Sequence, residues 1–190
     1  MLLGLRRDKK IIFSAAAILA VAGVVFFASK YFLWGEDKLI AYSNLPFHVA
    51  LEYPDSWGVN PEGGAFQGVP LYFGGYDGYF GIDAIAGDEG VSIDDTIDVL
   101  VKGNSNFPYG SNPVVSEGTI DGTEARFVFP SEDQPEEAKE EAVVVVRYPA
   151  PITIGDASYT FFMLYGDKHH LKSISETVTF INEQNEELSE

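Results

Sequence analysis

The 190-residue chain has 29 acidic residues against 12 basic ones, which gives a formal net charge of −17 at pH 7. This excess argues against a nucleic-acid-binding protein, because phosphates must be neutralised by Lys and Arg. It also argues against a domain that lies flat on an anionic lipid surface. The chain has no cysteine, which excludes disulfides, thiolate metal ligands and cysteine nucleophiles.

A long apolar segment, IIFSAAAILAVAGVVFFASKYFLW, occupies residues 11–34. A helix of about 20 apolar residues spans the hydrocarbon core of a bilayer, so we predict one transmembrane helix here. Tyr31 and Trp34 suit the membrane interface. The side chains that we expect to form the membrane anchor are Ile11, Phe13, Ile18, Leu19, Val24, Val25, Phe26, Phe27, Tyr31 and Trp34.

The alternative interpretation of this segment is a cleaved signal peptide, with Ala20-Val21-Ala22 as a small-residue cleavage site. The apolar run continues beyond that site through Val24–Phe27, which favours an uncleaved anchor. Four basic residues precede the segment: Arg6, Arg7, Lys9 and Lys10. Their position predicts a single-pass cell-membrane protein with a cytoplasmic N-terminus and an extracytoplasmic C-terminal domain.

The chain is therefore divided into five predicted parts. A cytoplasmic N-terminus (1–10) precedes the transmembrane helix (11–34) and a polar spacer (35–45). One extracytoplasmic domain follows (46–181), and an acidic tail (182–190) ends the chain. The part after residue 34 is long enough for one domain with a substantial hydrophobic core.

The first half of the domain shows strand patterns. Apolar and polar residues alternate over Phe47–Tyr53, which predicts a half-buried strand. The Gly- and Pro-rich stretch Asn60–Gly68 is predicted to be a loop. Two short strands are expected near Leu71–Phe73 and Tyr79–Ile85, joined by the glycine-rich turn Gly74–Gly78.

A helix is predicted to begin at Ser92, because Ser92-x-x-Asp95 is similar to a capping box. Gly103 is a suitable helix end. One apolar face is formed at helical spacing by Ile93, Ile97, Leu100 and Val101. A hairpin should follow, with strands Val114–Ile120 and Thr123–Phe129 around the Asp121-Gly122 turn.

The acidic stretch Ser131–Glu141 is predicted to be a solvated excursion. Ala142–Tyr148 contains four consecutive valines, and a strand without alternation should be central and covered on both faces. We expect Pro149–Pro151 to turn the chain into a second apolar strand, Ser158–Tyr165. A last helix is predicted over Lys168–Val178. These elements predict an α+β domain with a mainly antiparallel sheet and helices packed on it.

Several short motifs follow one another in a familiar order. They are Glu52-Tyr53-Pro54-x-x-Trp57, Ser92-x-Asp94-Asp95-Thr96, Ile120-x-Gly122-x-x-Ala125-Arg126, Val145-Val146-Arg147-Tyr148-Pro149 and Tyr159-x-Phe161-Phe162-x-Leu164-x-Gly166-Asp167-x-x-His170-Leu171. In this order and spacing the sequence resembles the PsbP-like/Mog1-like superfamily, especially its bacterial membrane-anchored or secreted members. The resemblance covers about Leu45 to Ile181.

The resemblance implies an α/β/α sandwich with a central antiparallel sheet and helices on both faces. It also implies a non-catalytic role in binding proteins or assisting assembly. The predicted anchor departs from the soluble plant members that assist the oxygen-evolving photosystem, so that role is not carried over. The role of the intracellular GTPase-regulating member is not carried over for the same reason.

Two groups of residues were considered as metal ligands. Some PsbP relatives bind metal through histidine and carboxylates, which draws attention to His169-His170. Adjacent residues on a helix point about 100° apart, so we interpret them as surface histidines and leave metal binding by His170 open. An acidic cluster contains Asp83, Asp88, Glu89, Asp94, Asp95 and Asp98. It lacks a spaced calcium loop and suits the N-terminus of a helix, so no metal site is assigned.

The sequence contains no G-x-S-x-G, S-x-x-K or H-E-x-x-H motif and no phosphate-binding loop. We therefore predict a non-enzymatic protein without a cofactor. Tyr76 and Tyr109, in glycine-flanked turns, are expected to be exposed and to contact a partner.

The predicted function is protein binding or assembly of an envelope complex. The alternatives are a small-molecule or divalent-metal binding protein and an envelope hydrolase. The identity of the partner and the oligomeric state are left open.

Overall fold

The computed structural model describes residues 38–87, 90–103 and 108–181. The predicted anchor over residues 11–34 and the predicted acidic tail over residues 182–190 lie outside these ranges. Within the described ranges, no helix has the length and apolar character needed to cross a membrane. From Leu39 onward the described residues belong to one compact unit.

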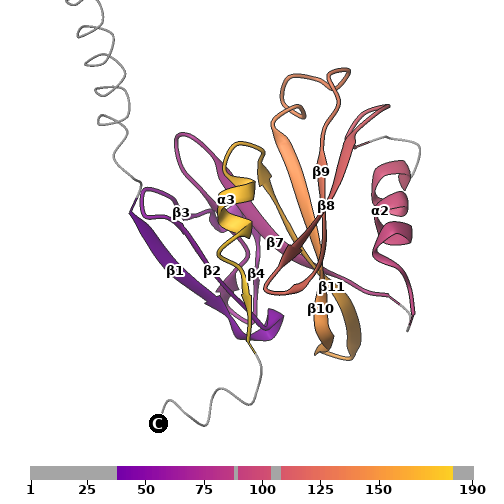
Figure 1. The fold of residues 1–190 in the computed structure, drawn as a ribbon. Coiled ribbons are helices and arrows are strands. Elements are labelled where there is room, and N and C mark those ends of the chain that lie inside the picture. Colours follow the sequence, from indigo (N-terminus) through magenta and orange to yellow (C-terminus); the bar gives the residue numbers. More distant parts are fainter. Residues whose placement is uncertain (1–37, 88–89, 104–107, 182–190) are drawn as a thin grey trace, which may run out of the picture. The chain divides into compact units, whose positions relative to one another are not determined.

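A seven-stranded sheet forms the centre of this unit, in the order β3-β6-β7-β11-β10-β9-β8 (Figure 1). All its neighbouring strands pair antiparallel. Its strands are β3 (Gly58–Val59), β6 (Tyr72–Gly74), β7 (Tyr79–Ile85), β8 (Val114–Ile120), β9 (Thr123–Phe129), β10 (Glu141–Ile154) and β11 (Ala157–Asp167).

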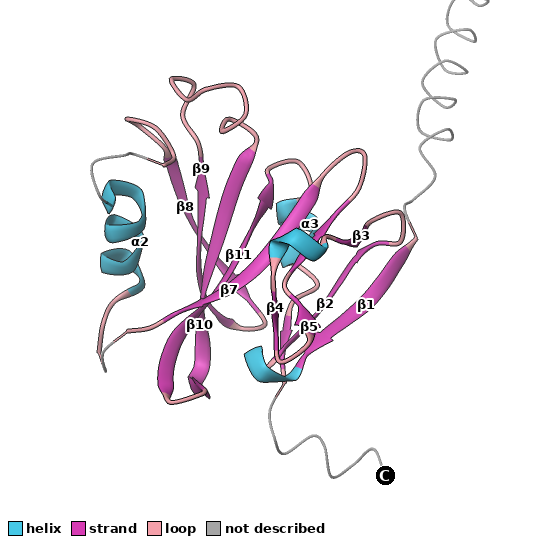
Figure 2. Cartoon of the chain, turned by 180° about the vertical axis from the view of Figure 1, so that it is seen from behind, coloured by secondary structure: helices cyan, strands magenta, loops and turns pink. Residues whose placement is uncertain are grey.

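The remaining elements form layers on either side of this sheet. A three-stranded sheet is formed by β1 (Leu39–Asn44), β2 (Val49–Pro54) and β12 (Thr179–Phe180). A separate hairpin is formed by β4 (Ala65–Phe66) and β5 (Val69–Pro70). The helices are α2 (Ile93–Lys102), α3 (Leu171–Ser175) and the 3-10 turns η1 (Leu45–Phe47) and η2 (Pro61–Gly63). Helix α2 packs on one face of the large sheet, here called the outer face (Figure 2). Helix α3 and the three-stranded sheet pack on the inner face.

Strand β10 shows why the large sheet is buried on both faces. Its residues Ala142, Val144 and Val146 join the inner core, whereas Val143 and Val145 join the outer core beneath α2. All five are fully buried, because successive side chains of a strand point to opposite faces. The predicted central strand is thus confirmed. Within the described ranges, the buried core side chains run from Tyr42 to Phe180.

The contact between β7 and β11 requires a glycine. A Cβ atom on Gly166 would collide with the carbonyl oxygen of Tyr79 and would lie 2.9 Å from the Cα atom of Phe80. These are backbone atoms of the neighbouring strand, so they cannot move without disturbing the pairing. Gly166 therefore lets the two strands approach closely in the middle of the sheet.

Helix α2 begins as predicted. The Ser92 hydroxyl accepts a hydrogen bond from the backbone N–H of Asp95 at 3.0 Å, which caps the helix. Ile93 and Ile97 are buried against the outer face. The predicted hairpin of β8 and β9 is also present, with Ile120 paired to Thr123.

Arg126 on β9 fastens α2 to the sheet. Its Nε donates to Asp94 Oδ1 at 2.8 Å, and its Nη2 donates to Asp94 Oδ2 at 3.2 Å and to Glu124 Oε1 at 3.0 Å. The Arg126 side chain is only 8% exposed. A two-point contact of this kind fixes direction as well as distance, so it orients the first turn of α2 on β9.

Three local predictions are wrong. The predicted spacer contains β1, because residues 39–44 pair with β2 in continuous register. The predicted loop Asn60–Gly68 contains η2 and β4. The chain does not turn at Pro149–Pro151. Instead β10 continues through a register shift between Arg147 and Ile152, where prolines are tolerated, and turns near Gly155.

The last helix and the covering of the inner face also differ from expectation. Helix α3 is shorter than predicted because Asp167 caps an irregular turn before it, and the Thr177 hydroxyl then bonds to the Ile174 carbonyl at 2.7 Å. The chain next enters β12, which pairs with β2. The inner face is therefore covered by a mixed layer of sheet and helix rather than by helices alone.

Candidate functional site

A hollow of about 640 Å³ lies beside β3 and the turn between β6 and β7. We call it the turn hollow. Its walls combine aromatic and aliphatic side chains with two carboxylates: Val59, Pro61, Tyr72, Tyr79, Asp77 and Asp167. The rings of Tyr72 and Tyr79 stack with their centroids 5.5 Å apart. The hollow combines an apolar lining with convergent polar groups, so it is the candidate binding site.

The β6–β7 turn beside the hollow is held in one shape. The backbone N–H of Gly75 donates to the carbonyl of Gly78 at 2.8 Å, and the indole N–H of Trp57 donates to Asp77 Oδ1 at 2.8 Å. A Cβ atom on Gly78 would lie 2.7 Å from the Trp57 ring, and one on Gly75 would collide with it. Both glycines are needed because the turn backbone lies directly against Trp57.

Tyr76 stands at the tip of this turn and is fully exposed, at 107% of its reference area. Its predicted exposure is therefore confirmed. A large ring that is exposed on a well-held turn is available for contact with another molecule, because little conformational freedom is lost on binding. Whether Tyr76 contacts a partner stays a prediction.

The predicted exposure of Tyr109 is wrong. Tyr109 is 7% exposed and belongs to the outer core with Ile97 and Val128, and burial raises the pKa of its phenol. Its carbonyl accepts a hydrogen bond from the backbone N–H of Ser131 at 2.9 Å, which draws the segment onto the sheet. In this position Tyr109 supports the core and does not offer a surface to a partner.

His170 lies at the edge of the turn hollow, between two carboxylates. Its Nδ1 is 2.9 Å from Asp167 Oδ1, and its Nε2 is 4.0 Å from Asp77 Oδ2. The edge of its ring meets Trp57 at a centroid distance of 5.1 Å. The backbone N–H groups of His169 and His170 both donate to Asp167 as well. This carboxylate is thus the cap of the turn before α3.

The two adjacent histidines point to different partners, as their spacing predicts. The Nε2 of His169 is 3.1 Å from Glu140 Oε2, away from Asp167 and Asp77. Across residues 38–87, 90–103 and 108–181, no group of three or more His, Cys, Asp or Glu residues is arranged to hold a metal ion. Metal binding by His170 therefore receives no support from geometry.

The acidic cluster is dispersed by the fold. Asp94 binds Arg126, and the carboxylate of Asp98 pairs with Lys102 on the same helix. The carboxylate of Asp95 accepts a hydrogen bond from the Ser92 hydroxyl. Asp83 stands apart on β7, and residues 88 and 89 lie outside the described ranges. The carboxylates of Asp94, Asp95 and Asp98 thus each have a partner on or beside α2.

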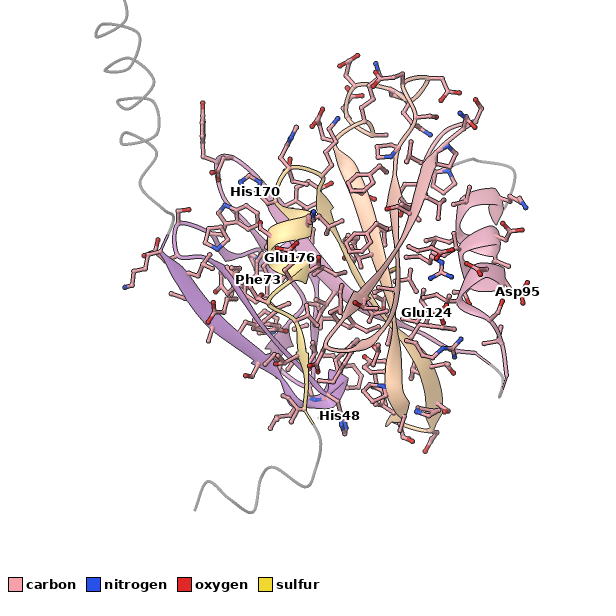
Figure 3. The ribbon with its side chains drawn as sticks, in the orientation of Figure 1. His48, Phe73, Asp95, Glu124, His170 and Glu176 are labelled. Atoms are coloured by element: carbon pink, nitrogen blue, oxygen red, sulfur yellow. The ribbon has the colours of Figure 1, made fainter. Side chains whose placement is uncertain are left out.

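The histidine–aspartate pair does not meet a nucleophile in the way a hydrolytic triad does. The second ring nitrogen of His170 faces the Asp77 carboxylate rather than a hydroxyl, and a triad needs a hydroxyl or thiol at that point. The hydroxyl of Ser173 donates instead to the His170 carbonyl at 2.8 Å. His48 lies at the opposite end of the domain (Figure 3). What this site offers is carboxylates and aromatic faces, a combination that attracts cationic groups.

A further carboxylate, that of Glu141, is bound to Tyr79 beside the hollow. The Tyr79 hydroxyl donates to Glu141 Oε2 at 2.9 Å. Burial and the Glu141 carboxylate raise the pKa of Tyr79, so the Tyr79 hydroxyl remains a neutral donor. This bond connects β7 with the start of β10.

The surface as a whole is strongly negative. The described ranges contain twenty acidic residues against seven basic ones. Six of those seven bases lie within 4.0 Å of a carboxylate: Lys102, Arg126, Lys139, Arg147, Lys168 and Lys172. Most of the positive charge is thus paired, and the remaining field favours a basic molecule.

Sequence reasoning missed the residues that build the hollow around Tyr76. Trp57 and Asp77 are twenty positions apart, and their hydrogen bond depends on how β3 and β6 pair. The available signal was the spacing Gly75-Tyr76-Asp77-Gly78. Glycines on both sides of an aromatic residue indicate that the backbone passes close to another group.

No protein-family model matches the sequence, and the search of curated proteins gives no significant match. Among solved structures, the fold is similar to the solution structure of cyanobacterial PsbP (CyanoP) from Synechocystis sp. PCC 6803. The two sequences are 16% identical, the match covers 77% of this chain and 95% of the other, and the TM-score is 0.42. The likeness lies in a mostly antiparallel sheet with few helices.

Proposed function

We propose that this chain is a non-catalytic protein-binding protein that docks a basic segment of its partner at the turn hollow. The observation that carries the proposal is the full exposure of Tyr76 on a turn that Trp57 and Asp77 hold in place beside an acidic, aromatic hollow. Tyrosine is enriched among the residues that dominate binding energy at protein interfaces.

The chemistry of the hollow supports a basic partner. Asp77 and Asp167 provide carboxylates for Lys or Arg, and the faces of Tyr72 and Tyr79 suit a guanidinium or ammonium group. Negative charge over the rest of the surface would speed the encounter with such a partner.

The proposal also places this domain at a membrane. The uncharged segment from Ile11 to Ala28, preceded by basic residues, supports an anchor with the domain on the extracytoplasmic side. The partner is then a component of the cell envelope. Protease treatment of intact cells tests the orientation: the domain should be degraded from outside, and its protection would contradict this placement.

Site-specific photo-cross-linking tests the docking site. A photoreactive phenylalanine analogue replaces Tyr76 in the full chain, and a matched control carries it at Val114, which is 61% exposed on β8. We expect an adduct of defined mass from position 76 and not from position 114. Raised salt and Asp77→Asn should both lower the yield of the position-76 adduct. The Asn side chain can still accept the Trp57 hydrogen bond, so Asp77→Asn removes the charge and keeps the turn in place.

The proposal fails if position 76 gives no adduct, or if positions 76 and 114 give the same adducts. It also fails if the yield does not respond to salt, because the charge of the hollow then plays no part.

A further inference from the structure

Helix α2 covers only part of the outer face. It packs on β9 and β10 through Ile93 and Ile97, and it is the helix that Figure 2 shows on that face. On the next strands, β11 and β7, the outward side chain of Phe161 is fully buried, whereas Ile85, Met163 and Tyr165 are only partly buried. A helix is about 10 Å wide and strands are about 4.8 Å apart. Two neighbouring strands therefore offer about the width of one helix.

An apolar hollow of about 330 Å³ lies between α2 and this strip. We call it the α2 groove. Its apolar lining consists of Ile85, Ala86, Val91, Val99, Leu100 and Met163. Val99 is 73% exposed, so a partner that covers it would remove apolar surface from water and gain binding energy.

The groove side of α2 is distinct from the side that faces the sheet. Thr96, Val99 and Leu100 stand at i, i+3 and i+4 and line the groove, whereas Ile93 and Ile97 pack into the outer core. Side chains at this spacing form one flank of a helix. Helix α2 therefore has two apolar flanks, one for the sheet and one for a neighbour beside it.

The charges around the groove are negative. Asp95 belongs to its lining, and Asp83 is exposed on β7 directly opposite Met163 in the strand register. Two cations lie nearby, and both are engaged. Arg147 is bound by the Val91 carbonyl at 2.9 Å and by Glu124 at 3.6 Å, and Lys102, one helical turn beyond Val99, pairs with Asp98. An occupant of this groove must combine apolar side chains with positive charge.

We propose that the α2 groove binds one amphipathic, basic α-helix of a partner protein. The apolar stripe of that helix covers Val99, Leu100 and Met163, and its Lys or Arg side chains face Asp95 and Asp83. A second copy of α2 does not fit, because its first turns carry Asp94, Asp95 and Asp98 and would bring like charges together.

This surface is separate from the proposed docking site for a basic segment. The groove lies at the Ile85 end of β7 and the turn hollow at the Tyr79 end, about 20 Å apart along a strand of this length. A partner bound in the groove would therefore leave Tyr76 accessible.

The test uses residues 38–190, which contain the described residues of the inner and outer cores. The ligand is a labelled synthetic helix of about 14 residues, long enough to span the groove. The peptide contains Lys and Leu, with Leu at i, i+3, i+4 and i+7. One control peptide replaces Lys with Glu, and a second has the same composition without the stripe. Fluorescence anisotropy measures binding. We expect saturable binding of the Lys peptide alone.

Variants locate the binding. Val99→Glu and, independently, Asp83→Lys should each weaken the affinity roughly tenfold or more. Val114→Glu, at a similarly exposed valine on β8, should leave the affinity unchanged. Circular dichroism confirms that each variant is folded.

Three results would overturn the proposal. Equal binding of the unstriped peptide means that charge alone is recognised. Unchanged affinity in both Val99→Glu and Asp83→Lys places the peptide elsewhere. Self-association of the wild-type unit in sedimentation, abolished by Val99→Glu, makes a second copy the occupant.

Discussion

The contact between Arg126 and Asp94 should determine how firmly α2 is held on the sheet. We consider Arg126→Met and Asp94→Asn, singly and together, in a double-mutant cycle. Arg126→Met removes the buried cation but keeps much of its apolar stem. Asp94→Asn keeps the shape of the carboxylate and removes its charge. The coupling free energy of the cycle isolates the interaction between the two side chains.

The expected coupling follows from the geometry. Two charge-assisted hydrogen bonds join the pair, at 2.8 and 3.2 Å. Hydrogen bonds to charged groups contribute about 1.5–3 kcal/mol, whereas exposed ion pairs contribute about 0.2–1 kcal/mol. Arg126 is 8% exposed but Asp94 is 70% exposed, so water screens one partner. We therefore expect a coupling of about 1–2 kcal/mol, between these limits.

Urea unfolding of residues 38–190 measures the coupling, at low salt and in 1 M NaCl. The matched control is Asp98–Lys102, an exposed i,i+4 pair on the same helix, for which about 0.3–0.5 kcal/mol is expected. The Arg126–Asp94 coupling should be larger and should persist better in salt. Equal couplings for the two pairs would refute the idea that a half-buried contact fastens α2.

Three further predictions concern the core and one loop. Phe162→Ala, at a fully buried inner-core position, should lower the free energy of unfolding by about 3–5 kcal/mol in urea titrations. Gly166→Ala should destabilise by about 1–3 kcal/mol or more through its clash with β7, while Gly58→Ala, with open space around it, should change little. Hydrogen bonds from Ser131 and Ser111 lower the pKa of Asp133 to about 2. The stability that the ionised Asp133 contributes is present above about pH 4 and is lost as pH falls through about 2. Asp133→Asn should therefore make the urea midpoint depend less on pH in acid.

The elements with strong local signals were predictable. Ser92 marks the start of α2, and the Asp121-Gly122 turn places the β8–β9 hairpin. The valine run of β10 predicted a strand covered on both faces. In each case the information lies within about ten neighbouring residues, so the sequence pattern is sufficient.

The errors arose where distant contacts decide the structure. Residues 39–44 have a polar, spacer-like character, but pairing with β2 makes them a strand. Tyr109 stands in a glycine-flanked turn of the sequence, but it packs in the outer core, and its carbonyl accepts a hydrogen bond from Ser131 on a distant segment. The turn hollow and the α2 groove depend on strand order, which no local pattern contains.

The pairing of β2 sets the order in which the domain can be completed. Its N-terminal neighbour β1 is adjacent in sequence, but its other neighbour is β12, and the Glu52 N–H bonds to the Thr177 hydroxyl 125 residues later. A contact of such long range forms late, because the whole intervening chain must first be available. During synthesis the three-stranded sheet therefore cannot be completed until β12 emerges. A chain that ends before Thr177 would leave β2 with an unpaired edge.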